Sequence, residues 1–255
     1  MKIAIITGAS SGIGEEFAKQ INEKYPWLDE VWLIARNRSR LQAVAEQMTM
    51  KTRIIAADMS QPVNIKDFKL ILANAKPQIK LLVQAAGYGR LGRMEEDDMQ
   101  EQLGMIRTNC EALTAFAYLC LPYCKRGTRI INLASSAAFM PQPRMAVYAA
   151  SKAYVLSFSR ALAQEVKDRQ ITVTAVCPGP VETNFFERAG GTDRLGAIKR
   201  LGYEEKEQVV ARALYDAVKG KEISVSSILM QGLRGVSKVA PHGLLLNALN
   251  LFGEA

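Results

Sequence analysis

A tyrosine and a lysine stand one helical turn apart at Tyr148 and Lys152, in the sequence Tyr-Ala-Ala-Ser-Lys. The apolar residues that follow as far as about Val166 predict a largely buried helix with both side chains on one face. An ammonium group beside a phenol favours the phenolate and lowers the phenol's pKa from about 10 towards neutrality. Tyr148 would then be a usable general acid or base. Such pairs also arise by chance, so the chemistry depends on support from the rest of the chain.

A glycine-rich stretch follows the first apolar run of the chain, Ile3 to Thr7. This order predicts a strand, a turn and a helix, in which a pyrophosphate approaches the backbone N–H groups at the helix N-terminus. A side chain at any of the glycines would block the turn or that approach, although a purely structural turn is the alternative. The expected cofactor contacts in this stretch are Gly8, Ser10, Ser11, Gly12, Ile13 and Gly14.

The second predicted strand, Val31 to Ala35, ends at Arg36. In dinucleotide-binding folds an acidic residue about 20 positions after the glycines binds the ribose hydroxyls and selects NAD, whereas an arginine nearby binds a 2′-phosphate. Arg36 stands in that place, so the sequence favours NADP(H), with Ser10 and Asn37 as helpers. The alternative is that Arg36 is a solvated loop residue.

Two later strand ends carry further candidate cofactor contacts. Asp58 follows the predicted strand Arg53 to Ala57 and either accepts a hydrogen bond from the adenine amine or caps the next helix. Ala86 and Gly87 follow the predicted strand Ile79 to Val83, and their small size lets the chain pass close to the adenosine ribose.

Helical patterns alternate with strand patterns along the whole chain. Further strands are predicted at Arg129 to Ala134, Ile171 to Cys177 and Glu222 to Ile228, and helices at Arg38 to Met48, Ile65 to Asn74, Asn109 to Cys124 and Glu204 to Val218. About seven strands alternating with helices of about 10 to 15 residues predict an α/β fold with a doubly wound parallel sheet. We expect one domain over residues 1–255.

Composition excludes several other classes of protein. The single histidine, His242, leaves no His-based triad or multi-histidine metal site in one chain, so no metal is expected. The four cysteines lie in apolar segments, which predicts buried reduced thiols. The net charge of +8 comes from scattered basic residues, so nucleic-acid binding is not expected. Without a leader or a transmembrane stretch, the chain is expected to be cytoplasmic.

These motifs together resemble the short-chain dehydrogenase/reductase family in its compact form, over nearly the whole chain to about residue 226. The matching motifs are Thr7 to Gly14 for the cofactor, Ala85-Ala86-Gly87, Tyr148 with Lys152, and Pro178 to Thr183. The resemblance implies a Rossmann fold and hydride transfer between a nicotinamide and a carbonyl or secondary alcohol. It also implies a homodimer or homotetramer.

The resemblance further implies a role for each member of a catalytic tetrad. Tyr148 passes a proton to or from the substrate oxygen, while Ser135, with Ser136 as the alternative, orients that oxygen. Lys152 binds the nicotinamide ribose and lowers the pKa of Tyr148, and Asn109 holds a water through which protons reach Lys152. Thr183 and the Val181 backbone are expected to hold the nicotinamide carboxamide, and Pro178 and Gly179 belong to the same cofactor-binding segment.

The sequence also departs from the family pattern. Gln84 and Ala85 replace two asparagines, so the hydrogen bonds that brace the sheet must be found elsewhere. The leucine-rich segment 227–255 is atypical, and it is expected to line a substrate pocket, to pack in the core or against a second subunit, or to lie on a membrane surface. The glycine-containing segment 182–203 is a candidate substrate lid.

The loops that flank the site favour a fairly apolar small-molecule substrate, such as a ketone or a hydroxysteroid. The residues behind this expectation are Tyr88, Phe139, Met140, Phe185 and Phe186. One alternative is a 3-oxoacyl-thioester reductase, which the basic charge balance suits and the C-terminal segment does not. The other is a binding protein that senses NADP(H) without turnover.

Overall fold

The computed structural model describes residues 1–181, 203–241, 243 and 246. Several residues discussed above lie outside these ranges. They are Thr183, Phe185, Phe186 and His242, together with nearly all of the candidate lid and most of the segment after residue 241.

The described residues form one seven-stranded sheet in the order β3-β2-β1-β4-β5-β6-β7. Every neighbouring pair of strands is parallel. The order reverses at the pair of β1 and β4, which confirms the predicted doubly wound sheet. The strands are β1 Lys2–Thr7, β2 Glu30–Ala35, β3 Thr52–Ala56, β4 Gln78–Gln84, β5 Cys124–Leu133, β6 Thr172–Val176 and β7 Ile223–Ser224.

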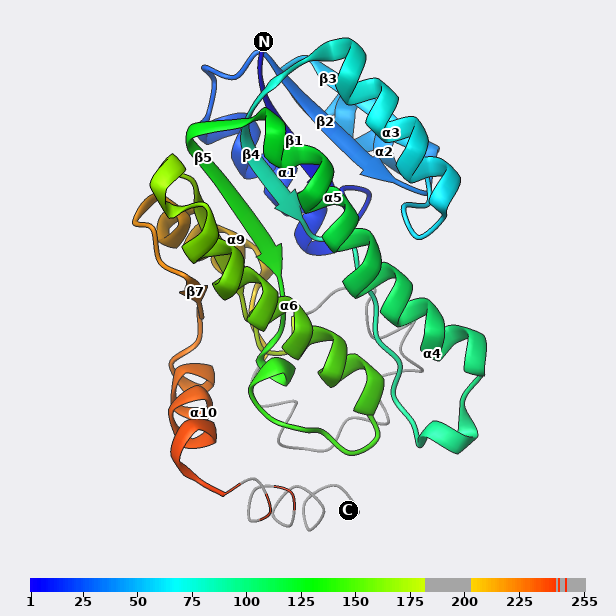
Figure 1. Ribbon diagram of the computed structural model, residues 1–255, viewed down its shortest axis with the longest axis vertical. Coiled ribbons are helices and arrows are strands. Elements are labelled where there is room, and N and C mark those ends of the chain that lie inside the picture. The colour runs from blue at the N-terminus through cyan, green and yellow to red at the C-terminus, as the bar shows by residue number, and fades with distance from the viewer. Residues whose placement is uncertain (182–202, 242, 244–245, 247–255) are drawn as a thin grey trace.

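Helices cover both faces of this sheet (Figure 1). Helices α1, α2 and α9 pack on one face, and α3, α5 and α6 pack on the other. The α-helices are α1 Gly12–Lys24, α2 Arg38–Glu46, α3 Pro62–Ala75, α4 Met99–Ile106, α5 Leu113–Cys120, α6 Ala146–Glu165, α9 Lys206–Val218 and α10 Ile228–Val239.

The apolar sequence of β1 explains why helices must cover both faces of the sheet. Successive side chains of a strand point to opposite faces, so Ile3 and Ile5 enter one core while Ala4 and Ile6 enter the other. All four are fully buried. A strand that is apolar at every position is typical of a parallel sheet between two helical layers.

Several predicted elements have different bounds in the structure, most of all around Cys124 and after Ser224. The helix predicted over Asn109 to Cys124 ends at Cys120, and Cys124 already begins β5. The prediction is wrong there because Cys120 and Cys124 are both buried in one core, so the apolar pattern runs on after the helix has ended. The last strand stops at Ser224 rather than Ile228, since Ile228 begins α10.

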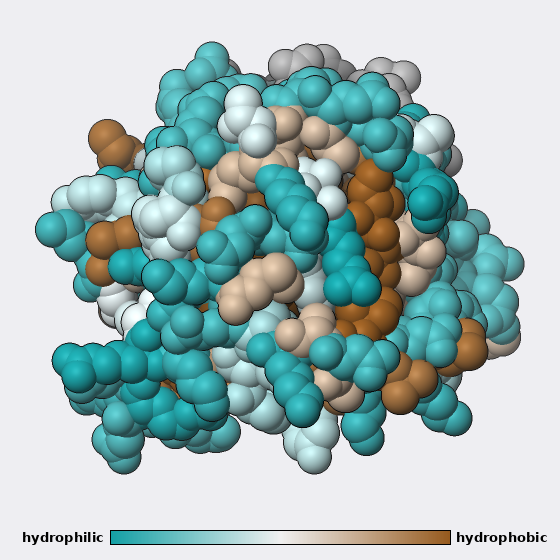
Figure 2. Space-filling view, turned by 90° about the horizontal axis from the view of Figure 1, so that it is seen from above, coloured by the Kyte–Doolittle hydropathy of each residue, from teal (hydrophilic) through white to brown (hydrophobic). Residues whose placement is uncertain are grey.

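The end of the molecule where the strands begin is covered mainly by hydrophilic side chains, with apolar ones in several smaller patches between them (Figure 2). Cys120, Cys124 and Cys177 are buried as predicted, whereas Cys110 is half-buried. Burial raises the pKa of the Cys124 and Cys177 thiols to about 12, so both are neutral near pH 7.

Across the described ranges, no helix is both long enough and apolar enough to cross a bilayer.

Candidate active site

The predicted site residues lie at the edge of the sheet where the central strands end. Strands β1, β4, β5 and β6 end at Thr7, Gln84, Leu133 and Val176. They are parallel neighbours, and the arrowheads of β4 and β5 point towards the same end of the molecule in Figure 1. In open parallel sheets, ligands bind outside this edge, at the point where the strand order reverses. That point falls between β1 and β4 in this chain.

The turn after β1 leaves no room for side chains at two of its glycines. Gly8 has a φ of +70°, and a Cβ there would lie 2.8 Å from the Ala85 carbonyl carbon and from the Ala86 nitrogen. A Cβ at Gly14 would overlap the Gly8 carbonyl oxygen. The turn therefore packs directly against both the loop after β4 and the first turn of α1.

The N-terminus of α1 has no side-chain cap. Ser11 is the N-cap residue, but its side chain accepts no hydrogen bond from the helix. Ser10 and Ile13 are half-buried beside it. Because an uncapped helix N-terminus presents free N–H groups and a partial positive charge, it is suited to a phosphate. The glycine cradle and this helix end together fit the pyrophosphate of a dinucleotide.

The chain after β2 exposes a cation. Arg36 is exposed and forms no ion pair with any residue in the described ranges. Asn37 is the N-cap of α2, where its Oδ1 accepts from the Arg40 N–H (3.0 Å) and the Ser39 hydroxyl (2.8 Å). These bonds leave the Asn37 NH2 group for a ligand, and the Arg36 guanidinium has no acidic partner among the residues that the structure describes.

Asp58 stabilises the turn that leads to α3. Its Oδ1 accepts from the Ser60 N–H (3.0 Å) and hydroxyl (2.7 Å). Gln61, not Asp58, is the N-cap residue of α3, so the predicted helix cap is wrong. The role of adenine acceptor stays a prediction.

Gln84 supplies the brace that the missing asparagines left open. Its Nε2 donates to Asn132 Oδ1 (3.0 Å), and Asn132 Nδ2 donates in turn to the Ser159 hydroxyl (2.9 Å). This chain of bonds joins β4 to β5 and to α6. The next residues are tied to β1, because the Ala86 N–H donates to Thr7 Oγ1 (3.2 Å).

Asn109 lies in a π-helical turn, Arg107–Ala112, between α4 and α5. It is 1% exposed, and its amide binds both backbone groups of Tyr88, accepting from N–H (3.1 Å) and donating to C=O (3.0 Å). A third bond runs from Nδ2 to the Ser151 hydroxyl (2.9 Å). Such π-turns are frequent at functional sites, and this one clamps the loop after β4.

Gly87 lies where this loop meets the side chains of two helices. A Cβ there would be 2.9 Å from Asn109 Oδ1 and 3.3 Å from Lys152 Nζ. The predicted residues Gly87, Asn109 and Lys152 are therefore brought together at one point. A water held by Asn109 stays a prediction.

Ser135, Tyr148 and Lys152 converge at the end of β5. The Ser135 hydroxyl is hydrogen-bonded to the Tyr148 side chain, and its oxygen accepts from the Ala137 N–H (3.2 Å). Lys152 Nζ donates to the Leu133 carbonyl (2.7 Å) and lies 5.8 Å from the centroid of the Tyr148 ring. This arrangement favours Ser135 over Ser136.

Burial controls the protonation of the pair. It raises the pKa of Tyr148 to about 12, although the Ser135 hydroxyl lowers it. Burial also lowers the pKa of Lys152 to about 8. The prediction that the Tyr148 pKa lies below its ordinary value is wrong for this geometry, because desolvation of the phenol outweighs any stabilisation of the phenolate by an ammonium that is bonded to the Leu133 carbonyl. Near neutral pH Tyr148 is a proton donor and Lys152 is mostly charged.

The lowered pKa of Lys152 predicts an unusual dependence of stability on pH. An unfolded lysine has a pKa near 10.5 and the folded one about 8, so between these values the unfolded chain binds the extra proton. The difference in unfolding free energy between wild type and Lys152→Met should therefore move in favour of wild type by about 1.4 kcal/mol per pH unit from pH 8 to 10.

Urea unfolding of both proteins at several pH values measures this difference. It should be constant below about pH 7, where both states of wild type are protonated. Lys167→Met, at an exposed lysine, should give no slope over the same range. A Lys152→Met difference that is flat up to pH 10 would mean that the lysine is not desolvated.

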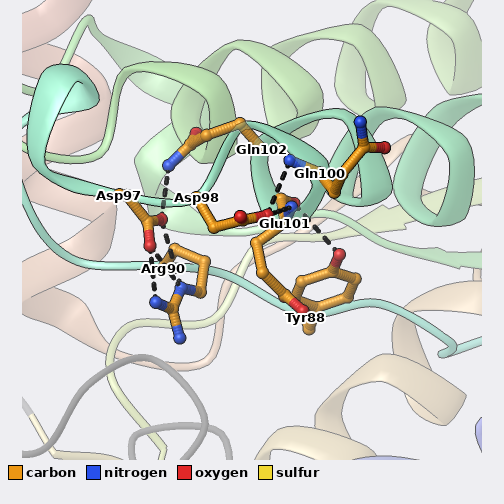
Figure 3. Close-up of polar contacts among 7 residues, drawn as sticks. All are labelled: Tyr88, Arg90, Asp97, Asp98, Gln100, Glu101 and Gln102. Carbon is orange, nitrogen blue, oxygen red and sulfur yellow. Dashed lines mark hydrogen bonds and ion pairs between the residues drawn. The ribbon is translucent and has the colours of Figure 1, made fainter.

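The loop after Gly87 is fixed to α4 by a set of polar contacts (Figure 3). The Tyr88 hydroxyl donates to the Glu101 carbonyl (3.0 Å). Arg90 Nε donates to both oxygens of Asp97 (3.1 Å), and Gln102 Nε2 donates to the same carboxylate (2.6 Å). The Arg90 guanidinium holds the pKa of Asp97 below its ordinary value. These contacts fix the position of the loop.

Apolar side chains surround Tyr148, and some of them come from this loop. The cluster around Tyr148 contains Tyr88, Leu91, Met105, Ala137, Met145 and Ala149. Of the residues expected to favour an apolar substrate, Tyr88 is in this cluster, whereas Phe139 packs in another one with Met230 of α10. Met140 is buried.

The segment after β6 lies next to the serine loop. The Ser136 N–H donates to the Pro178 carbonyl (2.8 Å), and Val181 forms a parallel bridge with Glu204. Sequence reasoning missed Ser151 and Glu204 as residues that hold the site, and it gave Thr7 only as part of the cofactor motif. A serine between Tyr148 and Lys152 and a glutamate before a helix carry no distinctive signal.

Comparisons with known proteins agree with this geometry. A family model described as short chain dehydrogenase matches residues 2–194. An uncharacterized oxidoreductase of Staphylococcus epidermidis is 29% identical over 232 residues, which cover 90% of this chain and 96% of the relative.

Solved structures extend the likeness to the whole fold. A short-chain dehydrogenase from Sphingobium yanoikuyae in complex with NADPH is 26% identical, with a TM-score of 0.80 over 96% of this chain and 95% of that one. A short chain dehydrogenase/reductase from Burkholderia phymatum in complex with NAD is 19% identical, with a TM-score of 0.78 over 92% of each chain. The second likeness shows the fold alone.

Proposed function

This chain belongs to the short-chain dehydrogenase family, and from that premise we propose that it transfers hydride between NADP(H) and the carbonyl or secondary alcohol of a fairly apolar substrate, of the ketone or hydroxysteroid type. As a family member it is an oxidoreductase that acts on CH–OH or C=O groups with a nicotinamide cofactor. One observation carries the proposal: Ser135, Tyr148 and Lys152 converge beside the glycine turn at the same edge of the sheet.

The proposed mechanism begins with two hydroxyls that share one hydrogen bond. Ser135 and Tyr148 can both donate to a substrate oxygen placed between them, which orients the carbonyl and stabilises the charge that develops on it. Tyr148 then gives its proton to that oxygen. When bound, the nicotinamide supplies or accepts the hydride.

Lys152 acts on the tyrosine after the proton has left. Its ammonium lies 5.8 Å from the phenol ring centroid, where a positive charge stabilises the phenolate. Because burial lowers its pKa to about 8, Lys152 can also return a proton to Tyr148 near physiological pH. Asn109 keeps the loop with Gly87 beside the lysine and is proposed as a positioning residue.

The choice of NADP(H) rests on Arg36. Its guanidinium is exposed at the end of β2 and has no acidic partner in the described part of the chain. β2 is the strand next to the glycine turn of β1, and the Ala9 N–H bonds to the Ile34 carbonyl (3.3 Å). An arginine there can bind a 2′-phosphate with two parallel hydrogen bonds.

Replacing Arg36 by aspartate should reduce kcat/KM for NADPH by about 10- to 100-fold and raise it for NADH, because a charge-assisted phosphate contact is worth about 1.5–3 kcal/mol. The measurement is steady-state kinetics with both coenzymes. Arg40→Asp makes the same charge change at another exposed position. It therefore controls for the effect of the protein's net charge on coenzyme binding. Equal effects of the two variants would remove the specific role of Arg36.

The substrate class is tested by turnover of a panel of ketones, oxo-steroids and 3-oxoacyl thioesters with NADPH. The apolar cluster around Tyr148 favours the first two groups. Turnover confined to the thioesters would favour the alternative reductase. Assembly into a homodimer or homotetramer stays a prediction, which light scattering of the purified protein tests.

A further inference from the structure

Glu204 ties together three separate parts of the chain just before α9. Its Oε1 accepts a hydrogen bond from the Gly179 N–H (2.6 Å), and the Ser226 hydroxyl donates to its Oε2. Its own N–H donates to the Pro180 carbonyl (2.8 Å). One residue therefore joins the segment after β6 to the segment after β7 and to the start of α9.

These contacts use the carboxylate entirely for hydrogen bonding. Glu204 is half-buried and forms no ion pair with any described residue. Hydrogen bonds to an ionised acceptor are shorter and stronger than neutral ones. The charge of Glu204 therefore serves to hold a backbone N–H and a hydroxyl rather than a neighbouring cation.

The anchored segment, residues 178–181, is held from its other end by the serine loop. The Pro178 carbonyl accepts from the N–H of Ser136, the residue next to Ser135. A shift of this segment would therefore change its position relative to Ser135 and Tyr148. Under the proposed function, this segment lies against the nicotinamide carboxamide.

We propose that Glu204 is a positioning residue for hydride transfer, which holds the segment 178–181 through Gly179 and Pro180 so that the nicotinamide is aligned with Ser135 and Tyr148. This inference rests on the proposed function. Hydride transfer is sensitive to small displacements of the reacting atoms, so loosening the segment reduces the rate more than it reduces cofactor binding.

Three variants separate this role from a general loss of stability. Glu204→Ala removes both side-chain bonds. Glu204→Gln keeps them in altered form, because an amide oxygen accepts from Gly179 and an amide NH2 donates to the Ser226 oxygen. Glu205→Ala is the matched control, since Glu205 is the exposed N-cap of α9 and makes no cap hydrogen bond.

The first readout needs no turnover. Hydrogen exchange of a peptide that covers residues 178–181 should be at least about tenfold faster in Glu204→Ala than in wild type, since its Gly179 N–H has lost its acceptor. Addition of NADPH should protect this peptide less in the variant than in wild type. Glu204→Gln and Glu205→Ala should resemble wild type in both respects.

The second readout is kinetic. With NADPH as coenzyme, Glu204→Ala should lower kcat by about tenfold or more. The dissociation constant of NADPH should change by less than about threefold. With the 3-acetylpyridine analogue, which lacks the carboxamide, the loss in kcat should be smaller. Glu204→Gln should restore most of the rate.

Two results would overturn the proposal. One is unchanged exchange of the segment in Glu204→Ala; the other is equal loss of kcat with NADPH and with the analogue, which indicates a general structural effect. Failure of the proposed function looks different, because wild type would then reduce no carbonyl substrate. In that case, NADPH protection of the peptide that is equal in wild type and Glu204→Ala also refutes the role of Glu204.

Discussion

Replacing Tyr148 by phenylalanine is expected to lower turnover by about a thousandfold or more while the affinity for NADPH stays within about threefold of wild type. The hydroxyl is the proton donor in the proposed mechanism, and Ser135 holds it in place by a hydrogen bond. Removing one oxygen leaves the buried ring in its apolar cluster, so the site keeps its shape. Single-turnover kinetics and fluorescence titration with NADPH measure the two quantities separately.

Tyr154→Phe provides the matched control for this variant. Tyr154 lies on the same helix but is 42% exposed, and its hydroxyl bonds to Thr114. Its loss should leave turnover nearly unchanged. Equal falls in turnover and NADPH affinity for Tyr148→Phe would instead indicate that the tyrosine serves only to bind the cofactor. Binding of NADPH by wild type with no turnover of any carbonyl compound would favour the sensor alternative.

Replacing Gly8 by alanine should destabilise the protein by about 3 kcal/mol and weaken NADPH binding by at least about tenfold. The left-handed backbone costs an L-residue about 1–2 kcal/mol, and the overlap with the backbone of Ala85 and Ala86 adds about 1–3 kcal/mol. The overlap cannot relax easily, since Ala85 and Ala86 are bonded to Thr7. Urea unfolding and NADPH titration measure the two effects.

The chain contains a closely matched control for the backbone term. Gly220 has the same φ of +70°, but among the described residues a Cβ there would meet only the Thr172 methyl group, at 3.7 Å. Gly220→Ala should therefore cost about 1 kcal/mol and leave NADPH affinity unchanged. If the two variants were equally destabilised, the close approach of the glycine turn to the loop after β4 would have no energetic importance.

Local patterns in the sequence were sufficient to predict the fold. Each strand of a parallel sheet between two helical layers is a short apolar run, and the apolar residues of each crossover helix recur with the helical period. Both patterns can therefore be recognised in the sequence without knowing which elements pack together. The same holds for the glycine turn and for the spacing of Tyr148 and Lys152, which one helix determines. Errors arose at Cys124, where apolar residues continue past the end of a helix, and at Ile228, which begins the next helix rather than ending the last strand.

The contacts that hold the site required the tertiary structure. Gln84 reaches Asn132 and Ser159, Asn109 clamps Tyr88, and Glu204 holds Gly179 across strands and helices that are distant in the chain. The spacing of apolar residues along the chain does not predict such pairs, because they depend on how the helices and strands pack rather than on where each one begins.

The protonation of Tyr148 likewise depends partly on the sequence and partly on the tertiary structure. The sequence determined that a phenol and an ammonium share a helix face, which predicts a lowered pKa for Tyr148. The structure decided the outcome, since burial of the phenol raises that pKa and the ammonium of Lys152 is directed at the Leu133 carbonyl. Spacing along a chain determines which groups can meet, whereas desolvation and hydrogen bonding depend on everything that surrounds them in three dimensions.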